Sequence, residues 1–301
     1  MVAPQAEILS FPATDRDFSA QPAQRRIWFR LRQNKPGLFG LAIVGLFFLL
    51  ALGVWIGWLG QAWSTAEGGR WEAAGPEHWF GTNVLGQDIF HRAIYSVRTA
   101  FEIGLLVSLL STLLGALLGA VSGWYSQSWV DDSILWLKGV LDSIPFYLFV
   151  AAVAFALQGK PWAMHVAMIA TFWTATGRLV RAEVMRIKSR EFVLSACAIG
   201  LPVHTILLRH ILPNTAHILM VQATIAFVAA IKTEVILSFL GLGVQDGVSW
   251  GLMLAESTQE VLAGHFNNFL AASLMLFTLL LGLNLLADAM QDAFDPRQST
   301  L

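Results

Sequence analysis

The chain has 301 residues, of which 56% are hydrophobic and 13% charged, and its formal net charge is −1. A soluble domain carries about a quarter charged residues, so this composition favours membrane spans over a large soluble core. The near-neutral charge gives no indication of a nucleic-acid partner. The single Cys197 excludes an internal disulfide and disfavours a cysteine-based metal site.

The first 24 residues are mixed and polar, which predicts a disordered tail. No short apolar core with a small-residue cleavage site stands at the start, so the first apolar run, within residues 25–60, is predicted to be an uncleaved anchor. Residues 61–102 are predicted to form an outer loop with an interfacial helix. Residues 103–297 would form a core of five further spans around a segment at 191–213, and residues 298–301 a second tail.

Six apolar runs are candidates for membrane helices, which predicts an all-α integral membrane protein. They are rich in Leu, Ala, Val and Gly and show no period-2 alternation, which excludes a membrane barrel. The fourth run is the shortest. The predicted spans are Leu38–Leu59, Ile103–Trp124, Ile134–Gln158, Trp162–Gly177, Thr215–Val244 and Phe266–Ala287.

The distribution of basic residues predicts the orientation. An even number of spans places both termini on one side, and the side with more Lys and Arg faces the cytoplasm. Fourteen of the 19 basic residues lie with the termini, between spans four and five, or at Lys138. The other five are Arg70, Arg92, Arg98, Lys160 and Lys232. Both termini and the segment between spans four and five are therefore predicted to be cytoplasmic.

Small residues recur every four positions in the second span, at Ser111, Gly115, Gly119 and Gly123. A stripe of small side chains on one helical face lets another backbone approach closely, and in lipid this packing drives helix association. The stripe therefore predicts a helix-packing face, whose partner belongs to this chain or to another.

Ionisable groups inside spans are costly and are candidates for function. Lys138 and Asp142 are four residues apart and can pair on one helix near its cytoplasmic end, where a structural role is favoured. Lys232 and Glu234 are two apart and point in different directions. We expect them near the outer surface, where they either contribute to a gate or solute path or only sit at the interface.

The sequence offers little for enzyme or metal chemistry. His204, His210 and His217 lack the three- or four-residue spacing of helical metal ligands. No phosphate-binding loop ending in Gly-Lys-Ser/Thr and no hydrolase or metalloprotease motif is found, so we expect no bound cofactor, no bound metal and no catalysis in this chain. The adjacent Asp131 and Asp132 indicate a solvated turn and a helix start.

Two segments are predicted on the outer side. Residues 245–265 form one, and residues 60–100 contain apolar side chains at helical spacing that indicate an interfacial helix. Together they would form either a docking surface for a soluble partner or a cover over the spans. The apolar positions are Leu85, Ile89, Phe90, Ala93, Ile94 and Val97.

The segment Glu191–Leu208 can form one or two short helices at the membrane surface, broken near Gly200 and Pro202. It is too apolar for a free loop, so it needs the membrane, its own spans or another protein to pack against. Its sequence "SACAIG…RHILPN" resembles the EAA motif of ATP-binding-cassette importer permeases, with Gly200 and Pro213 at the motif's separation and Ala196 at its second alanine. Leu194 replaces the motif glutamate and Ser195 its first alanine.

Other stretches resemble the second permease of the dipeptide, oligopeptide and nickel branch. They are "FRLRQNKPGLFGLAIVG", "HWFGTNVLGQDIFHRAIYSVRTAFEIGL", "TEVILSFLGLGVQDGVSWG" and "LLADAMQDAFDPR". The likeness covers roughly residues 25–297 in order, with Asn83 and Gln87 in place of the usual Asp and Arg. Lys232 also departs from the family pattern.

This resemblance implies a bacterial inner-membrane permease that transports short peptides or peptide-like solutes by alternating access. It implies a second homologous permease, one or two ATPase subunits that bind ATP and Mg, an extracytoplasmic solute-binding protein and surrounding lipid as partners. The segment between spans four and five would be the coupling helix that docks on the ATPase. The residues assigned to coupling are Phe192, Val193, Ser195, Ala196, Ile199, Gly200, Val203, Ile206, Leu207 and Pro213.

Two other functions are weighed against this one. A self-sufficient ion-driven carrier requires inverted repeats and carboxylates near the membrane midplane, and neither is evident. An intramembrane enzyme requires catalytic groups that converge at one depth, and none converge convincingly. Among importer substrates, peptides come first, with modified peptides, nickel chelates and opines behind them.

Overall fold

The computed structural model describes residues 33–157, 160, 162–243 and 247–294. The predicted tails at residues 1–24 and 298–301 lie outside these residues. The described part is helical, with two isolated β-bridges in the outer loop, between Ala66 and Gln87 and between Thr82 and Asp88. The helices are α2 Lys35–Trp55, η2 Gln61–Trp63, α3 Ile89–Trp124, α4 Trp129–Ser143, α5 Phe146–Ala156, α6 Ala163–Lys188, α7 Glu191–Ala198, α8 Val203–Thr205, the π-helix η3 Ile206–Ile211, the 3₁₀-helix η4 Leu212–Thr215, α9 Ala216–Phe239, α10 Trp250–Leu262 and α11 Asn267–Phe294.

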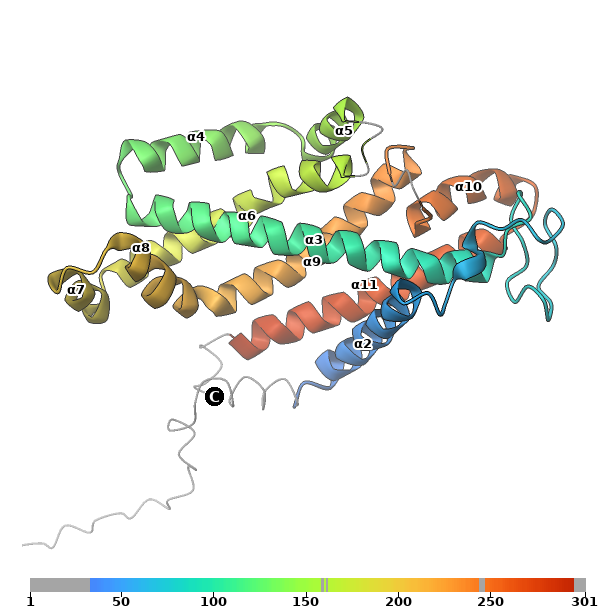
Figure 1. Cartoon of the computed structure of the whole chain (residues 1–301), viewed down its shortest axis with the longest axis horizontal. Coiled ribbons are helices and arrows are strands. Elements are labelled where there is room, and N and C mark those ends of the chain that lie inside the picture. Colours follow the sequence, from blue (N-terminus) through green and yellow to red (C-terminus); the bar gives the residue numbers. More distant parts are fainter. Residues whose placement is uncertain (1–32, 158–159, 161, 244–246, 295–301) are drawn as a thin grey trace, which may run out of the picture.

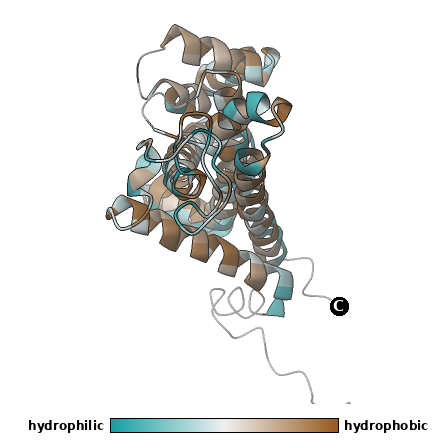
Figure 2. Ribbon diagram, turned by 90° about the vertical axis from the view of Figure 1, so that its right-hand side faces the viewer, coloured by the Kyte–Doolittle hydropathy of each residue, from teal (hydrophilic) through white to brown (hydrophobic). Residues whose placement is uncertain are grey.

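Three long helices, α3, α6 and α9, run alongside one another through the molecule (Figure 1). The short helices α7 and α8 lie at one end of this bundle, and α10 lies at the other end beside the outer loop that precedes α3. Helices α2 and α11 pack together. Figure 2 shows hydrophobic residues along the long helices and hydrophilic residues among the loops at the α10 end. The segment predicted to be cytoplasmic and the two predicted outer segments therefore lie at opposite ends.

The predicted separate interfacial helix is the first part of the long helix α3. It begins at Ile89, where the Asp88 side chain accepts a hydrogen bond from the His91 amide, and it continues without a break for 36 residues to the end of the predicted second span. Ala93 and Val97 are buried in the main core rather than facing lipid. The predicted helical spacing is present, but protein covers the apolar face, because residues of α2, α9, α10 and α11 belong to the same buried cluster.

The predicted third span is not one straight helix. It consists of α4 and α5, which are bent by 93° at Ile144 and Pro145. Proline has no amide hydrogen to donate, and it disfavours helical backbone at the residue before it. Ile144 accordingly has extended backbone, with ψ of 132°.

The described residues contain four continuous segments that are long and apolar enough to cross a membrane, or five if the bent pair counts as one. The four are Lys35–Trp55, Ile89–Trp124, Val203–Phe239 and Asn267–Phe294. Helix α6, which contains the predicted fourth span, is not among them, since its second half carries five charged residues. The multi-span helical class is confirmed, while the count of six remains a prediction.

The small-residue stripe of α3 faces α6 of the same chain. A Cβ atom on Gly119 would lie 2.5 Å from the Gly177 carbonyl oxygen, and one on Gly115 would lie 2.7 Å from that of Trp173. A Cβ on Gly123 would lie 2.7 Å from the Arg181 carbonyl oxygen. Ser111, at the start of the stripe, is also buried. Since such distances are sterically forbidden, the absence of side chains is what allows α3 and α6 to approach so closely.

Candidate functional site

The segment between α6 and α9 is a helical turn-back at one end of the bundle (Figure 1). Helix α7 ends at Ala198, and Gly200 follows in the left-handed region with φ of +79°. Pro202 then starts α8, which continues through η3 and η4 into α9. Glycine adopts this backbone conformation without the steric cost that a Cβ atom imposes, so Gly200 permits the reversal. Pro213 lies in the first turn of η4, where a missing amide hydrogen costs little.

The residues assigned to coupling divide between two faces of this segment. Val193, Ala196, Ile206 and Leu207 are buried and pack against the chain's own core, beside Val180, Val184 and Ile187 of α6. Phe192 is 46% exposed and Ile199 76% exposed, and Ser195, Gly200 and Pro213 are also exposed. Val203 is half-buried. The first group therefore anchors the segment, and only the second group is free to contact another protein.

Leu194 and Leu208 extend the exposed surface, with 56% and 57% of each residue accessible. Phe192 and Ile199 are seven residues apart and lie on the same side of α7, whereas Leu194 lies on another side of it. We call these exposed residues together, Phe192, Leu194, Ile199 and Leu208, the apolar docking face. Four large apolar side chains exposed at this end of the bundle are costly to leave in water. The arrangement therefore provides an anchored element with an unpartnered apolar surface.

Helix ends near the turn-back are connected by polar contacts. The Lys188 ammonium donates to the Trp124 carbonyl oxygen at 2.7 Å and lies over the Trp124 ring. The Arg181 guanidinium makes two hydrogen bonds to Asp131, at 2.9 and 2.7 Å, and the Ser122 hydroxyl donates to the same carboxylate. These contacts join α3, α4 and α6 into one unit that carries the coupling segment.

Asp131 was predicted to lie in a solvated turn, and this is wrong. Asp131 is only 2% exposed to solvent. It does start a helix, α4, as expected. The aspartate is buried because Arg181, which is 50 residues later in the chain, neutralises it, and a pattern of adjacent residues cannot reveal such a partner.

Lys232 and Glu234 point in different directions on α9, as expected. Glu234 is 2% exposed and accepts a hydrogen bond of 2.5 Å from the Ser238 hydroxyl one turn later. Lys232 is exposed. The two residues therefore do not form one site: Glu234 is part of the internal packing, and Lys232 faces outward.

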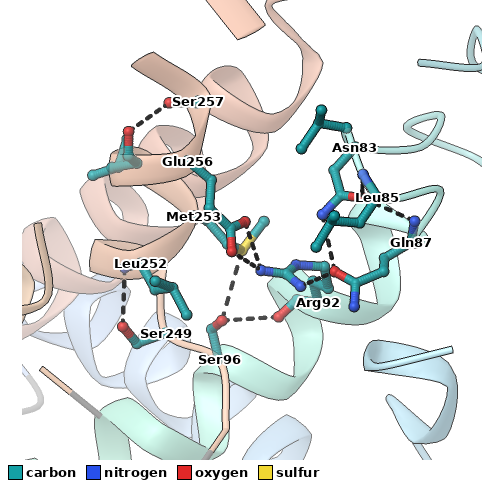
Figure 3. A network of polar contacts seen from close by, with 12 residues as sticks. Asn83, Leu85, Gln87, Arg92, Ser96, Ser249, Leu252, Met253, Glu256 and Ser257 are labelled. Carbon is teal, nitrogen blue, oxygen red and sulfur yellow. Dashed lines mark hydrogen bonds and ion pairs between the residues drawn. The ribbon is translucent and has the colours of Figure 1, made fainter. Parts of the chain in front are cut away.

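The outer end contains a polar network that the sequence did not suggest (Figure 3). Arg92 of α3 is 3% exposed, and its guanidinium contacts both carboxylate oxygens of Glu256 on α10, at 2.9 and 2.7 Å. It also donates to the Gln87 side chain, which accepts from Asn83 as well. Because 164 residues separate Arg92 from Glu256, neither local spacing nor helical periodicity could have paired them.

Two further hydrogen bonds connect α10 to the outer loop and to α3. The buried Glu260, one turn after Glu256, accepts a hydrogen bond of 2.8 Å from the Val84 amide. Trp250 at the start of α10 donates from its indole nitrogen to the Ala93 carbonyl oxygen at 3.0 Å. The outer loop, α3 and α10 are thus held as one surface.

Replacing Glu256 with alanine is expected to lower the free energy of unfolding by about 2 kcal/mol, less than for a fully buried ion pair because the Glu256 side chain is 23% exposed. The reason is that the buried Arg92 guanidinium would lose its counter-ion. Thermal unfolding of the purified protein measures the change. The control is Glu102→Ala, which breaks an exposed pair with Arg98 and should cost less than about 1 kcal/mol. Equal effects of the two substitutions would contradict a structural role for the buried pair.

The outer loop also contains a charge pair between His78 and Asp88. The His78 ring nitrogen Nδ1 lies 2.8 Å from the Asp88 carboxylate, and Glu72 is 3.8 Å away on the other side. The hydrogen bond to Asp88 raises the pKa of His78, although burial opposes the increase. Burial would raise the pKa of Asp88, but the hydrogen bonds from His78 and from the His91 amide outweigh it and lower that pKa.

These shifts predict how the outer loop depends on pH. Because the pKa of His78 is raised in the folded protein, its stabilising contribution is fully present below about pH 6.5, which is the pKa of histidine in the unfolded chain. The contribution is lost as the pH rises through the higher pKa of the folded protein. The contribution of Asp88 is present above about 3.9 and is lost as pH falls through its lowered folded pKa. His78→Gln should therefore lower the melting temperature more at about pH 6 than at about pH 9. An equal difference at both pH values would contradict the pairing.

Within the described ranges no group of three or more His, Cys, Asp or Glu side chains could hold a metal ion. The three histidines considered above are dispersed: His204 is in α8, His210 in η3 and His217 in α9.

Comparison with known proteins identifies the family of this chain. A family model described as the inner membrane component of binding-protein-dependent transport systems matches residues 111–300. The chain belongs to this family. The resemblance expected from the EAA-like segment is therefore confirmed, as is the location in the inner membrane.

Several relatives are similar to this chain over most of their length. The dipeptide transport system permease protein DppC of Bacillus subtilis is 33% identical over 274 residues, which cover 90% of this chain and 84% of that protein. The glutathione transport system permease protein GsiD of Pectobacterium atrosepticum is 34% identical over 289 residues, 94% of each chain. A probable peptide ABC transporter permease protein of Sinorhizobium fredii, y4tQ, is 42% identical over 221 residues, 73% of this chain and 75% of the relative.

The family assignment decides between the functions weighed above. An inner membrane component of a binding-protein-dependent system is a transport permease, which excludes the alternatives of a self-sufficient carrier and an intramembrane enzyme. The family match includes the whole coupling segment. It does not include the outer loop and the first part of α3, where Arg92 and His78 lie, but the relatives DppC and GsiD align over 90% and 94% of the chain.

Proposed function

We propose that the chain is one of two permeases of an ATP-driven importer that moves short peptides or peptide-like solutes into the cytoplasm. The observation that carries the proposal is the apolar docking face, held on a buried anchor at the end of the bundle opposite α10. An exposed apolar surface at a polar boundary marks a protein interaction site. The names of the relatives support peptides or peptide derivatives as the solute.

In this proposal the chain has six spans with both termini in the cytoplasm. Fourteen of the 19 basic residues then lie on the cytoplasmic side, as the positive-inside rule requires. Helix α6 would be the fourth span, with Ala163–Gly177 in the membrane and its charged second half reaching the cytoplasmic surface.

The partners follow from this arrangement. One or two ATPase subunits, which bind ATP and Mg²⁺, would dock on the apolar docking face, and a second homologous permease would complete the solute path. An extracytoplasmic solute-binding protein would dock on the surface formed by the outer loop and α10. Closure of the ATPase subunits would move α7 and, through the Lys188 and Asp131 contacts, the ends of α3, α4 and α6. Alternating access requires such a connection between ATPase and spans.

The assembly is tested by purifying the chain from its native membrane in a gentle detergent and identifying by mass spectrometry what accompanies it. We expect a second permease and ATPase subunits. Recovery of the chain alone in a stable, homogeneous form that transports solute in liposomes would contradict the proposal.

We also place the solute path along the exposed face of α9. Ile225, Lys232, Ile236 and Phe239 are exposed and lie on the side of α9 that the chain's own core leaves open. A lysine that faces lipid within a span is costly, so this face suits a hydrated path better. Lys232 would attract the side-chain carboxylate of an acidic solute.

Lys232→Gln is therefore expected to raise the KM for transport of acidic peptides more than that for neutral peptides, by roughly fivefold if one exposed ion pair of about 1 kcal/mol is lost. Competition between acidic and neutral dipeptides for uptake measures this preference. Lys160→Gln, at an exposed outer position, is the control. An unchanged preference would show that Lys232 does not contact the solute.

A further inference from the structure

A hollow of about 200 Å³ lies between α3, α4 and α6, away from the apolar docking face and from the exposed face of α9. Its walls are apolar, and the three basic residues that line it come from α4 and α6. Arg178 is ten residues before the end of α6, which corresponds to about 15 Å along the helix. The lining residues are Gly119, Ser122, Ile134, Leu135, Lys138, Trp173, Gly177, Arg178, Arg181 and Ala182.

The charges around this hollow do not balance. Arg181 and Asp131 neutralise each other through two hydrogen bonds. Asp142 is shared, since Lys138 contacts it at 2.5 Å and Arg178 at 3.3 Å. Three cations therefore face two carboxylates, and the surplus positive charge lies at Arg178, whose side chain is 67% exposed.

The next acidic side chain on α6 does not change this balance. Glu183 is held by Arg186 in a bidentate pair farther along the helix. Asp132 of α4 is exposed and lies in the first turn, beside Ser133 and Trp136 on a different face. The rim of the hollow therefore keeps one uncompensated cation.

We propose that this hollow binds an anionic phospholipid of the cytoplasmic leaflet, an assignment that rests on the orientation given under the proposed function. The apolar walls suit the start of an acyl chain, and the surplus charge at Arg178 suits a phosphate group. A small soluble anion would leave the apolar walls without a contact, and a neutral hydrocarbon would leave the cation without a counter-ion. A zwitterionic headgroup would bind less favourably, because its own positive charge would be repelled by the positive rim of the hollow.

The outer surface of α4 is consistent with a lipid environment. Trp129 and Trp136 are 78% and 71% exposed on this helix. Exposed indole rings are enriched where membrane proteins meet the headgroup region. Trp136 is next in sequence to Leu135, which lines the hollow, so α4 presents an exposed indole ring close to the hollow.

The experiment uses the purified transporter complex in nanodiscs that contain equal amounts of phosphatidylglycerol and phosphatidylethanolamine. Native mass spectrometry after release into detergent reports which lipid stays bound. We expect preferential retention of phosphatidylglycerol, and Arg178→Gln should reduce that preference about fivefold, the effect of one basic residue near an anionic headgroup. Because Arg178 is exposed, this variant is expected to fold. Glycerol phosphate added in solution should not displace the lipid.

Two further variants make the result specific. Arg186→Gln removes the same charge from the same helix outside the hollow and should leave retention unchanged. Ala182→Leu narrows the hollow without changing charge and should reduce retention. Equal retention by the wild type and Arg178→Gln, displacement by glycerol phosphate, or a second permease cross-linked through Leu135 would overturn the lipid site. The same spectra show whether ATPase subunits are bound, so failure of the lipid site is distinguishable from failure of the proposed function.

Discussion

Replacing Gly119 with leucine is expected to prevent stable packing of α3 on α6. A Cβ atom at this position would lie 2.5 Å from the Gly177 carbonyl oxygen and 3.0 Å from its Cα atom, so the clash is with backbone that cannot rotate away. Overpacking a core costs about 1–3 kcal/mol even where side chains can adjust. Gly119→Ala should already cost about this amount, and Gly119→Leu should abolish recovery of monodisperse protein.

The control substitutions use glycines in the same type of element. A Cβ atom at Gly45 of α2 or Gly139 of α4 would meet nothing within 4 Å. Alanine at these two positions should be neutral or raise stability by up to about 1 kcal/mol, because alanine favours helix over glycine. Melting temperature and size-exclusion profile in detergent compare the variants. If Gly119→Ala were as stable as Gly45→Ala, the close approach of α3 and α6 would be wrong.

Adding charge to the apolar docking face is expected to separate the permease from its ATPase. The double substitution of Phe192 and Ile199 by aspartate would place two carboxylates where an apolar contact is proposed. A hot-spot residue at the centre of an interface contributes about 2 kcal/mol or more, so the loss of even one such contact should weaken binding by at least about thirtyfold. Both side chains are exposed, so the fold should survive. Co-purification of ATPase subunits and transport in proteoliposomes measure the loss.

The control variant is Leu262→Asp, which changes a leucine that is 82% exposed at the end of α10. It places a carboxylate at the opposite end of the protein and should leave ATPase binding intact. Val193→Asp provides a second comparison. Because Val193 is fully buried, this substitution should destabilise the protein rather than only release the ATPase. Undiminished ATPase binding by the Phe192 and Ile199 variant would refute the docking face.

The apolar runs predicted most helices well, because lipid-spanning segments need continuous hydrophobic stretches. Their ends were less predictable. Helix α3 includes residues assigned to an interfacial helix, since one apolar face looks the same whether lipid or protein covers it. Pro145 was visible inside the predicted third span, and its effect on the preceding residue explains the bend there.

Polar contacts were the least predictable part. Lys138 and Asp142 are four residues apart and pair as expected. By contrast, Arg92 with Glu256 and Asp131 with Arg181 join residues that are distant in sequence. Only the approach of α10 to the start of α3, and of α4 to α6, brings them together. The sequence motif correctly located the coupling segment. Only the structure shows that Val193 and Ala196 are buried in it while Phe192 and Ile199 are exposed.

In the proposed importer, the exposed side of the coupling segment contacts an ATPase subunit in the cytoplasm. The only cysteine, Cys197, is exposed on α7 between Leu194 and Ile199, so the wild-type chain can be labelled without substitution. The measurement attaches a membrane-impermeant photoactivatable maleimide to Cys197 in native membrane vesicles and identifies the cross-linked protein by mass spectrometry. We expect labelling only in inside-out vesicles and a cross-link to the ATPase subunit. Labelling from the outer face, or a Cys197 that cross-links only to lipid in the intact transporter, would contradict it.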